Sequence, residues 1–341
     1  MNSNVNIPAN SKTALVLGAT GGIGGEVATQ LRQAGWQVRA LVRDVQRVAG
    51  RGDGLQWIEG DAMNAADVAR AAQGVSVIVH AVNPPGYQRW AELVLPMIDN
   101  TIAAARQVGA RIVLPGTVYN FGPDALPLLD EQSPQNPLTR KGAIRVEMER
   151  RLRAAADDGV RSLIVRASDF FGPKAGNNWF SQGLVKPGKP VGSITQPGRA
   201  GVGHQWAYLP DVARTMVLLL QREEQLRAFE IVHTAGHWDA DGSQMIESVR
   251  RVVTADGGKT PTVSRFPWWL LTLASPFVTV FREMNEMRYL WQQPVQMRNA
   301  RLLELLGDEP HTPLDEAVRT TLVGLGCLPD ASAAPTRLQA R

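Results

Sequence analysis

Residues 12–24 read KTALVLGATGGIG, and this stretch decides the fold class. A short apolar run at residues 13–17 ends at Gly18, and two more glycines follow at three-residue steps, Gly21 and Gly24. An apolar pattern typical of a helix begins directly after them. A strand, a glycine turn and a helix in this order present backbone N–H groups and a helix N-terminus to a pyrophosphate. The stretch therefore predicts a dinucleotide-binding site, with a strand–helix turn that binds nothing as the alternative.

Each glycine of the turn has its own steric reason. Gly18 permits the tight turn, Gly21 lets the backbone approach the phosphates, and Gly24 lets the helix pack closely on the sheet. The spacing is GxxGxxG rather than GxGxxG, so the motif needs support from the rest of the chain. The neighbouring residues that we also expect to contact the cofactor are Thr20, Gly22 and Ile23.

The bulk composition is that of an ordinary globular chain. Of the 341 residues, 44% are hydrophobic and 20% are charged, which suits one large domain or two domains that share an interface. The 36 Lys and Arg residues only slightly outnumber the 32 Asp and Glu residues, and they are scattered, so nucleic acid is not an expected partner. Cys327 is the only cysteine, which fits a reducing compartment.

Targeting and membrane signals are not evident in the sequence. The first residues are polar, without the apolar core of a secretory signal, and no apolar run reaches the length of a membrane span. We therefore expect a cytoplasmic protein without a membrane span. The most apolar stretch, residues 266–281, is interrupted by prolines. We expect a core helix there, with a surface-lying amphipathic segment as the alternative.

Strand-like and helix-like patterns alternate through the first half of the chain. The expected strands are residues 14–17, 37–42, 55–58, 75–81, 111–114 and 162–165. The expected helices are residues 23–34, 65–72, 90–108 and 141–156. This alternation predicts an α/β fold, a Rossmann doubly wound parallel sheet with helices on both faces. Ligands of such sheets bind beyond the carboxyl ends of the strands, so the residues after each strand are the site candidates.

The second half predicts a smaller, mainly helical C-terminal domain for the substrate. Residues 167–205 are rich in Gly, Pro and Asn and are typical of a pocket wall. The expected NAD(P)-binding Rossmann domain holds residues 12–170 and receives the segment at about 204–232, and the substrate domain holds residues 171–203 and 233–325. Residues 1–11 and 330–341 are expected to be flexible tails.

Arg43, which follows the second expected strand, bears on the choice of cofactor. A basic residue at this place can pair with the 2′-phosphate of NADP, whereas an acid would bind the ribose of NAD. Arg43 therefore favours NADP(H). Asp44 directly after it keeps NAD(H) open, and a solvated arginine is the alternative interpretation.

The third and fourth strands lead into further candidates for cofactor binding. Asp61 could accept a hydrogen bond from the adenine amino group, or could instead cap the helix that begins near Asn64. Ala62 follows Asp61. After the fourth strand, Ala81 is small enough to let a cofactor pass over the backbone, and Val82 lies beside it.

Several separated segments share one order and spacing with a known family. They are the glycine turn, Asp61, His80 with Ala81, Val118 with Tyr119, Arg166, Phe-Gly-Pro at 171–173, Tyr-Leu-Pro-Asp-Val-Ala at 208–213 and the stretch 299–316. Over residues 12–323 the chain resembles the extended short-chain dehydrogenase/reductase family, which includes the NAD(P)-dependent epimerases and dehydratases. The resemblance implies a Rossmann domain, a smaller substrate domain and a site in the cleft between them. By analogy, it also implies a homodimer through the helices at 90–108 and 141–156.

The chain departs from this family at the residues that carry the chemistry. The family has Ser or Thr after the fifth strand and a Tyr-x-x-x-Lys pair on the next helix. That tyrosine is the acid or base, and the lysine lowers its pKa and holds the nicotinamide ribose. Here Pro115 or Gly116 stands where the hydroxyl belongs, and no tyrosine lies between Tyr119 and Tyr208. The usual pair is therefore absent.

Four residues are candidate substitutes for the missing groups. Lys141 or Arg145 could hold the ribose, Tyr119 could donate a proton, and Thr117 could hydrogen-bond a substrate carbonyl. As alternatives, Lys141 and Arg145 could form an exposed basic helix face, and Tyr119 could pack under the loop that follows it.

Polar residues near the expected cleft are candidates for substrate contact. They are Asn83, Asp169, Asn178 and His204, with Arg166, Asn177 and Gln205 nearby. The paired asparagines could instead cap loop turns. His204 has no partner at metal-ligand spacing, so no metal site is expected.

Two functions fit these residues. The first is an NAD(P)-dependent oxidoreductase or epimerase-like enzyme that acts on a small carbonyl or hydroxyl substrate without the usual Tyr-x-x-x-Lys pair. The second is a non-catalytic NADP(H)-binding redox sensor or regulatory protein, which the loss of the usual catalytic positions favours. The enzyme is our first expectation, because residues 167–205 are expected to build a substrate pocket.

Overall fold

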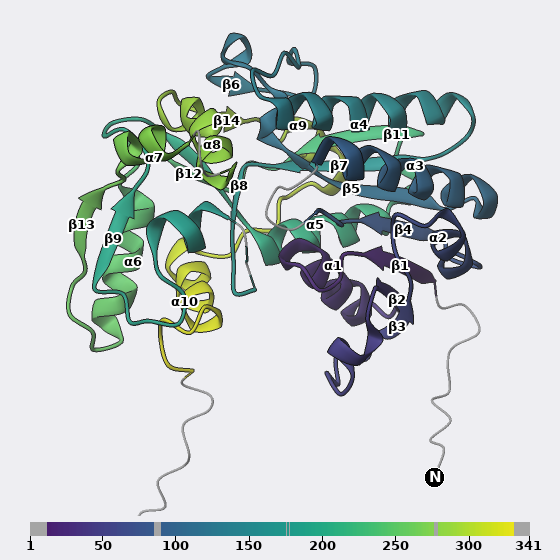
Figure 1. The fold of residues 1–341 in the computed structure, drawn as a ribbon, viewed down its shortest axis with the longest axis horizontal. Coiled ribbons are helices and arrows are strands. Elements are labelled where there is room, and N and C mark those ends of the chain that lie inside the picture. The colour runs from purple at the N-terminus through teal and green to yellow at the C-terminus, as the bar shows by residue number, and fades with distance from the viewer. Residues whose placement is uncertain (1–11, 85–89, 175, 177, 276–278, 331–341) are drawn as a thin grey trace, which may run out of the picture.

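The computed structural model describes residues 12–84, 90–174, 176, 178–275 and 279–330. Asn177, the expected tail at 1–11 and all but residue 330 of the expected tail at 330–341 lie outside these described residues. The centre of the fold is a seven-stranded parallel sheet in the order β11-β7-β5-β4-β1-β2-β3 (Figure 1). Its strands are β1 (Thr13–Leu17), β2 (Gln37–Val42), β3 (Gln56–Glu59), β4 (Val77–His80), β5 (Arg111–Thr117), β7 (Ser162–Ala167) and β11 (Phe229–His233).

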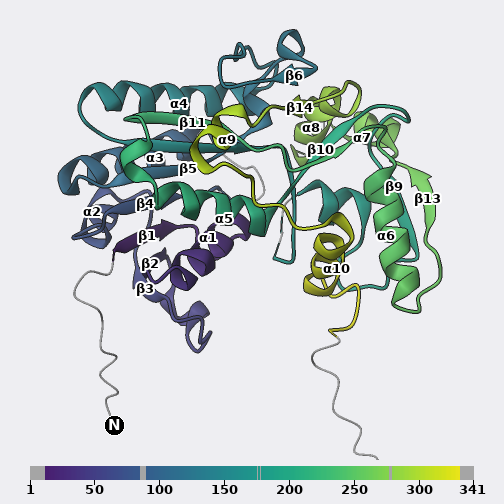
Figure 2. The same cartoon turned by 180° about the vertical axis from the view of Figure 1, so that it is seen from behind.

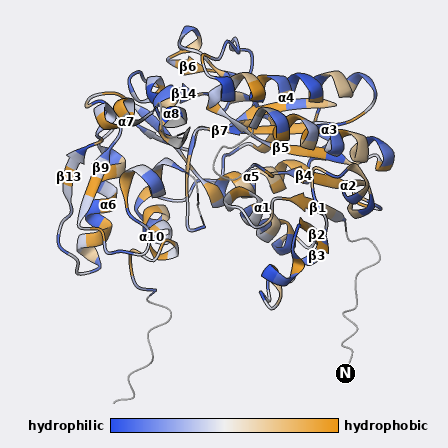
Figure 3. Cartoon of the chain, viewed as in Figure 1, coloured by the Kyte–Doolittle hydropathy of each residue, from blue (hydrophilic) through white to orange (hydrophobic). Residues whose placement is uncertain are grey.

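Helices cover both faces of this sheet, as Figures 1 and 2 show from opposite sides. One face carries α1 (Gly22–Gln33), α5 (Leu209–Leu220) and α9 (Ala300–Leu306), and the other carries α2 (Ala65–Ala71), α3 (Trp90–Val108) and α4 (Arg140–Asp157). Successive strand residues serve opposite faces, so Val16 packs towards α1 while Leu15 packs towards α3. The central strands β1 and β4 are buried on both faces and are mostly apolar, as Figure 3 shows by colour.

The expected Rossmann fold is confirmed. The strand order changes direction between β1 and β4, since the chain runs from β1 outward to β3 and then returns to β4 on the other side of β1. Such a switch point is where dinucleotides bind in open α/β sheets. β11 extends the sheet beyond the six strands expected from the sequence.

The second part of the fold combines helices with three small sheets. Strands β12 (His237–Asp239), β10 (His204–Tyr208) and β8 (Asp169–Phe171) form one sheet. The other two pair β13 (Thr262–Arg265) with β9 (Ser193–Gln196), and β14 (Gln296–Met297) with β6 (Leu128–Leu129). The helices are α6 (Gln244–Ala255), α7 (Trp268–Ala274), α8 (Thr279–Glu286) and α10 (Leu314–Gly324), with a π-helical turn at Phe180–Leu184.

Short 3-10 turns complete the regular structure. They are η1 (Val45–Val48), η3 (Val118–Asn120), η4 (Pro123–Ala125), η6 (Glu223–Gln225) and η7 (Met287–Trp291).

Two connections place the second part against the carboxyl edge of the main sheet. Only Ser168 separates β7 from β8, so the chain passes directly from the large sheet into the small one. Asp211 at the start of α5 accepts hydrogen bonds from the backbone N–H and the hydroxyl of Thr312, at 2.7 and 2.8 Å. These links bring β8 and β10 close to the end of β5.

The apolar stretch at residues 266–281 differs from the expected core helix. In α7, the side chains of Trp269 and Leu273 are 68% and 67% exposed, and Leu270 is 48% exposed, whereas Leu271 is buried. The prediction of a core helix is therefore wrong for α7, because one side of this short helix has no neighbour among the described residues. Within the described part of the chain, no helix is long and apolar enough to cross a membrane.

Candidate active site

The glycine turn between β1 and α1 lies in direct contact with the end of β4. Gly18 has a φ of +92°, and a Cβ built on it would lie 2.6 Å from the carbonyl oxygen of Ala81 and 2.8 Å from the N atom of Val82. A Cβ on Gly24 would lie 2.3 Å from the carbonyl oxygen of Gly18. Neither position has room for a side chain, so the turn, the helix and β4 meet backbone to backbone at the switch point.

The amino end of α1 has the form of an anion-binding site. Gly21 precedes the helix and has no capping side chain. The first helical hydrogen bond runs from the N–H of Gly25 to the carbonyl oxygen of Gly21. The N–H groups of Gly22, Ile23 and Gly24 therefore lack intrahelical partners, as at any helix start. Thr20 and Gly21 are exposed at this point, so the helix end is open to a ligand phosphate.

Arg43 and Asp44, at the end of β2, differ in their contacts. The Asp44 carboxylate accepts a hydrogen bond from the N–H of Gln46 at 3.0 Å and caps η1. Arg43 is exposed, and no hydrogen bond or ion pair engages it within the described residues. The carboxylate of Asp44 is thus engaged in capping η1, whereas the guanidinium of Arg43 is accessible to a ligand.

Asp61 and Ala62 follow β3. Asp61 Oδ1 accepts a hydrogen bond from the N–H of Met63 at 3.0 Å, whereas Asn64 caps α2 by accepting from the N–H of Ala66 at 2.9 Å. The alternative role of Asp61 as the cap of α2 is therefore wrong. The carbonyl of Ala62 accepts from the Asn100 side chain at 2.9 Å, which fixes this loop to α3.

His80, the last residue of β4, is buried and neutral. Burial first, and the positive charge of Arg145 second, lower its pKa to about 3. Its Nδ1 lies 2.8 Å from the hydroxyl of Thr101, which itself donates to the carbonyl of Met97. Nδ1 therefore donates to Thr101, and His80 links the end of β4 to α3.

Lys141 and Arg145 on α4 are buried, with exposed fractions of 6% and 8%. The Lys141 Nζ lies 5.0 Å from the ring centre of Trp90 and 5.3 Å from that of Tyr119. Arg145 donates to the side chain of Asn83 at 2.9 Å. The alternative interpretation as an exposed basic helix face is therefore wrong, because both cations point towards the ends of β4 and β5.

Tyr119, Asp169 and His204 form a hydrogen-bonded row beyond the end of β5. The hydroxyl of Tyr119 donates to Asp169 Oδ1 at 3.1 Å, and His204 Nε2 lies 3.0 Å from Asp169 Oδ2. The ring of His204 stacks on that of Trp291, with centres 3.8 Å apart and an angle of 12° between planes. Three candidates from separate segments thus meet in one place.

Thr117 and Arg166 lie beneath this row. The carbonyl of Thr117 accepts from Arg166 Nη1 at 2.7 Å, and its hydroxyl is 3.5 Å from the Asn120 side chain. Arg166 is fully buried and pairs with Glu149 at 2.7 Å. Burial and the charge of Arg166 lower the pKa of His233 well below its usual value, so His233 accepts a hydrogen bond from Arg166 Nε. Arg166 is therefore a structural residue that ties α4, β5 and β11 together.

Asn178 and Gln205 are engaged in holding the backbone. Asn178 Oδ1 accepts a hydrogen bond from the N–H of Ser181 at 2.8 Å. Asn178 therefore caps a turn, which was the alternative to its predicted contact with substrate. The amide of Gln205 accepts from the N–H of Met297 at 2.7 Å and donates to the carbonyl of Thr234 at 3.2 Å. Neither side chain is directed into the row of Tyr119, Asp169 and His204.

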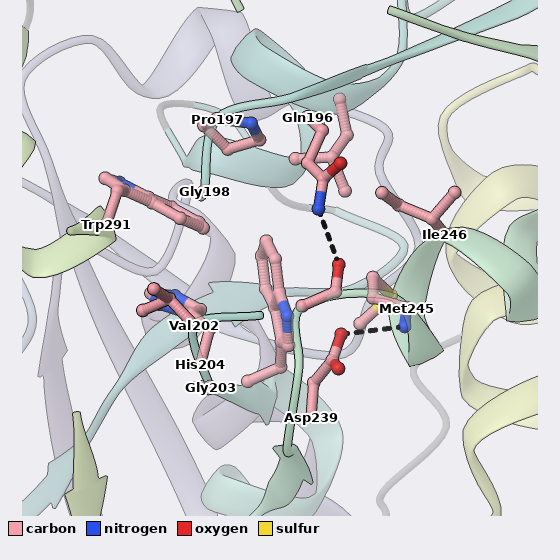
Figure 4. A pocket seen from close by; sticks show the side chains of 13 residues that line it. Gln196, Pro197, Gly198, Val202, Gly203, His204, Asp239, Met245, Ile246 and Trp291 are labelled. Atoms are coloured by element: carbon pink, nitrogen blue, oxygen red, sulfur yellow. Dashed lines mark hydrogen bonds between the residues drawn. The ribbon is translucent and has the colours of Figure 1, made fainter. Parts of the chain in front are cut away.

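A small cavity borders this row on the side of the second part of the fold (Figure 4). Its volume is about 20 Å³, and His204 and Trp291 form one wall, with Gln196 and Asp239 on the others. This is room for about one water molecule, so the cavity is too small for an organic substrate.

Trp90 and Trp291 are the residues that sequence reasoning missed. Each stacks on or lies beside a candidate residue, Trp90 against Lys141 and Trp291 against His204. No spacing rule pointed to them, since each contact joins distant parts of the chain. Within the described residues, no group of three His, Cys, Asp or Glu side chains could hold a metal ion.

Comparison with known proteins finds chains of similar sequence and structures of similar fold. The chain is 28% identical over 287 residues to the uncharacterized protein y4nL of Sinorhizobium fredii, a match covering 76% of this chain and 78% of that protein. It is 26% identical over 279 residues to a 3-diazoavenalumate denitrifying reductase of a Streptomyces species, covering 76% and 88%. A solved UDP-glucuronic acid 4-epimerase of Bacillus cereus in complex with NAD shares the fold, with a TM-score of 0.67, 16% identity, and 92% and 96% coverage.

The family model for the NAD dependent epimerase/dehydratase family matches residues 14–233. This range begins in β1 and ends with β11, so it spans the whole seven-stranded sheet. The resemblance noted in the sequence is thereby confirmed, and the chain belongs to the NAD dependent epimerase/dehydratase family.

Proposed function

We propose that the chain is an NADP(H)-dependent oxidoreductase that reduces a carbonyl group, or oxidises the matching hydroxyl group, of a small organic substrate. The observation that carries this proposal is the convergence of Tyr119 and Lys141, from different elements, beyond the carboxyl end of β5. The Streptomyces relative, a reductase by name, supports reduction, and the NAD bound by the Bacillus epimerase supports a nicotinamide cofactor.

The residues around the switch point fit a dinucleotide. The Gly18–Gly24 turn leaves no space for a Cβ but leaves the N–H groups of Gly22 and Ile23 available for a pyrophosphate. Ala81 and Val82 form the other wall. The residues that would contact the ends of the cofactor are Arg43 at the 2′-phosphate, Asp61 and Ala62 on the adenosine side, and Lys141 or Arg145 at the nicotinamide ribose. When bound, the nicotinamide supplies or accepts a hydride.

Tyr119 is the proposed proton donor in place of the missing Tyr-x-x-x-Lys pair. Its hydroxyl would give its proton to the carbonyl oxygen as negative charge develops there. The ammonium group of Lys141, 5.3 Å from the ring centre, favours the negative charge left on the phenol oxygen. Thr117 lies two residues earlier and would donate a hydrogen bond to the same substrate oxygen. Asn83 remains a proposed substrate contact.

The experiment that tests this proposal has two stages. Calorimetric titration with NADPH, NADP⁺, NADH and NAD⁺ comes first, followed by NADPH oxidation against a panel of aromatic and aliphatic aldehydes and ketones. We expect both NADP forms to bind and at least one carbonyl to be turned over. Tyr119→Phe should lower kcat by about 10²–10⁴-fold with unchanged NADPH affinity. The control, Tyr208→Phe, removes a hydroxyl hydrogen-bonded to Thr320 and should keep kcat.

A redox sensor without turnover is the second candidate, favoured by the absence of a tyrosine between Tyr119 and Tyr208. A strong preference for one redox form, with no turnover of any carbonyl, would support the sensor and overturn the enzyme. The homodimer through α3 and α4 and the cytoplasmic location stay predictions.

A further inference from the structure

The carboxylate of Asp169 lies between two groups that can carry a proton. The hydroxyl of Tyr119 donates to one of its oxygens at 3.1 Å, and His204 Nε2 donates to the other at 3.0 Å. Asp169 and His204 are each 4% exposed. Because an ionised carboxylate only accepts, both bonds direct a hydrogen atom towards Asp169. The three residues therefore form a continuous hydrogen-bonded path that leads from Tyr119 into the second part of the fold.

Loss of the Tyr119 proton would leave two anionic oxygens in contact. The phenol oxygen and Asp169 Oδ1 are 3.1 Å apart, and Asp169 is shielded from water. Two acidic oxygens in such a place do not both stay ionised. Tyr119 and Asp169 must then share one proton, and His204 is the protonatable side chain hydrogen-bonded to Asp169.

His204 is placed to gain a proton from the other side. Since Nε2 carries the hydrogen bonded to Asp169, the neutral ring has a bare Nδ1, and Nδ1 is buried without a partner in the described structure. The cavity of about 20 Å³ lies against this residue and has room for one water molecule. Trp291, stacked with its ring centre 3.8 Å from that of His204, holds the imidazole ring in place.

We infer that Asp169 and His204 are positioning and proton-relay residues that return a proton to Tyr119 in each turnover, an inference that rests on the proposed role of Tyr119. The O–H bond of Tyr119 breaks as the product hydroxyl forms. His204 Nδ1 takes a proton from water, Nε2 gives its proton to Asp169, and Asp169, after rotation of its carboxyl group, gives one to the phenol oxygen. Each group then has its starting number of protons, and the net proton comes from water. His204 is left with its hydrogen on Nδ1, so gain of a proton at Nε2 and loss of the Nδ1 proton to water restore the starting tautomer before the next turnover.

Three other charged or titratable groups lie around this path in the described part of the chain, and each has a defined position or hydrogen-bond partner. Lys141 lies on the α4 side of Tyr119. Asp239, opposite His204 on β12, accepts from the N–H groups of Gln244 and Met245. Tyr289 on η7 donates to the carbonyl of Phe121 at 2.8 Å, and burial raises its pKa to about 12. His204 is thus the side chain on this path that joins Asp169 to the cavity.

The test compares His204→Gln with the wild-type chain in steady-state NADPH oxidation across pH 5.5–9. A glutamine amide can still donate to Asp169 but cannot carry an additional proton. We expect kcat of the wild type to fall as pH rises across this range, and kcat of His204→Gln to be at least tenfold lower and independent of pH there. NADPH affinity and KM should change less than twofold. A His204→Gln variant with wild-type kcat and pH profile would overturn the relay.

Two further measurements separate this inference from the proposed function. If Tyr119→Phe keeps full activity, the proposed proton donor fails and the relay fails with it. If Tyr119→Phe is inactive while His204→Gln is fully active, only the relay fails. If His204→Gln does not fold, the pH profile of the wild type still tests the relay. A wild-type kcat that does not change between pH 5.5 and 9 would contradict proton return through a histidine.

Discussion

Gly24 is the most tightly enclosed residue of the glycine turn. A Cβ there would lie 2.3 Å from the carbonyl oxygen of Gly18, which belongs to the backbone and cannot swing aside. Gly24→Ala should therefore lower the free energy of unfolding by about 1–3 kcal/mol through overpacking and should weaken dinucleotide binding. Urea unfolding and calorimetric titration with NADPH measure the two effects.

Gly192→Ala is the matched control for this substitution. No atom outside its chain neighbours lies within 4 Å of a Cβ built on Gly192. It should leave both the free energy of unfolding and NADPH binding nearly unchanged. Equal unfolding free energies for the two variants would show that the turn can relax around an added methyl group.

Arg43 determines the proposed cofactor preference. Its guanidinium is exposed at the end of β2, while Asp44 is held by η1. Arg43→Ala should remove a charge-assisted contact worth about 1.5–3 kcal/mol, which raises the Kd for NADPH by roughly 10- to 100-fold and leaves the Kd for NADH within about twofold. Arg250→Ala, on α6, is the control. Equal weakening for both cofactors would mean that Arg43 does not contact the 2′-phosphate.

At the scale of single elements, α4 connects the candidate site to the core. Its first turns carry Lys141 and Arg145 towards the site, and Glu149, one turn later, pairs with the fully buried Arg166 of β7. Ile144 and Met148 pack into the sheet core between these polar groups. The helix therefore places the cations by apolar packing and by one buried ion pair.

Breaking that ion pair should be costly. Glu149→Gln leaves the Arg166 cation buried without a charged partner, and we expect the free energy of unfolding to fall by roughly 3–5 kcal/mol in urea unfolding. The adjacent Arg150 pairs with Glu147 on the exposed side of the same helix. Arg150→Ala should change stability little, since exposed ion pairs are screened by water. Similar losses for both variants would contradict the role given to the buried pair.

At the scale of the whole molecule, three buried histidines make stability depend on pH. Burial, mainly, lowers the pKa of His80 to about 3 and of His237 to about 4, and it also lowers the pKa of His233. In the unfolded chain these groups titrate near 6.5. The unfolded state therefore binds more protons between about pH 6.5 and 3, and the histidine contribution, complete above 6.5, is lost as pH falls through that window.

His80→Asn tests this dependence. Asparagine can keep a hydrogen bond to Thr101 but does not titrate. As pH falls from 6 to 4.5, the free energy of unfolding of His80→Asn should decrease less steeply than that of the wild type. The two slopes should differ by at most about 1.4 kcal/mol per pH unit, the contribution of one proton. Urea unfolding at a series of pH values measures the slope. Identical slopes would show that His80 is not held neutral in the folded protein.

The sequence by itself determined the central sheet and the dinucleotide turn. The apolar runs and the Gly18, Gly21 and Gly24 spacing are local signals, since a strand, a tight turn and a helix each depend on neighbours within a few residues. Six strands and four helices were therefore predicted close to their observed bounds. Strand β11 was missed, because its position at the sheet edge depends on pairing with β7.

Only the tertiary structure decided which side chains meet at the candidate site. In the sequence, Tyr119 and Asp169 are 50 residues apart, and Asp169 and His204 are 35 residues apart. No local spacing pattern therefore predicts that these side chains are in contact. The burial of Lys141 likewise depends on Trp90 from another helix. Local periodicity specifies backbone conformation, whereas the meeting of distant side chains is set by how the two parts of the fold pack at the carboxyl edge of the sheet.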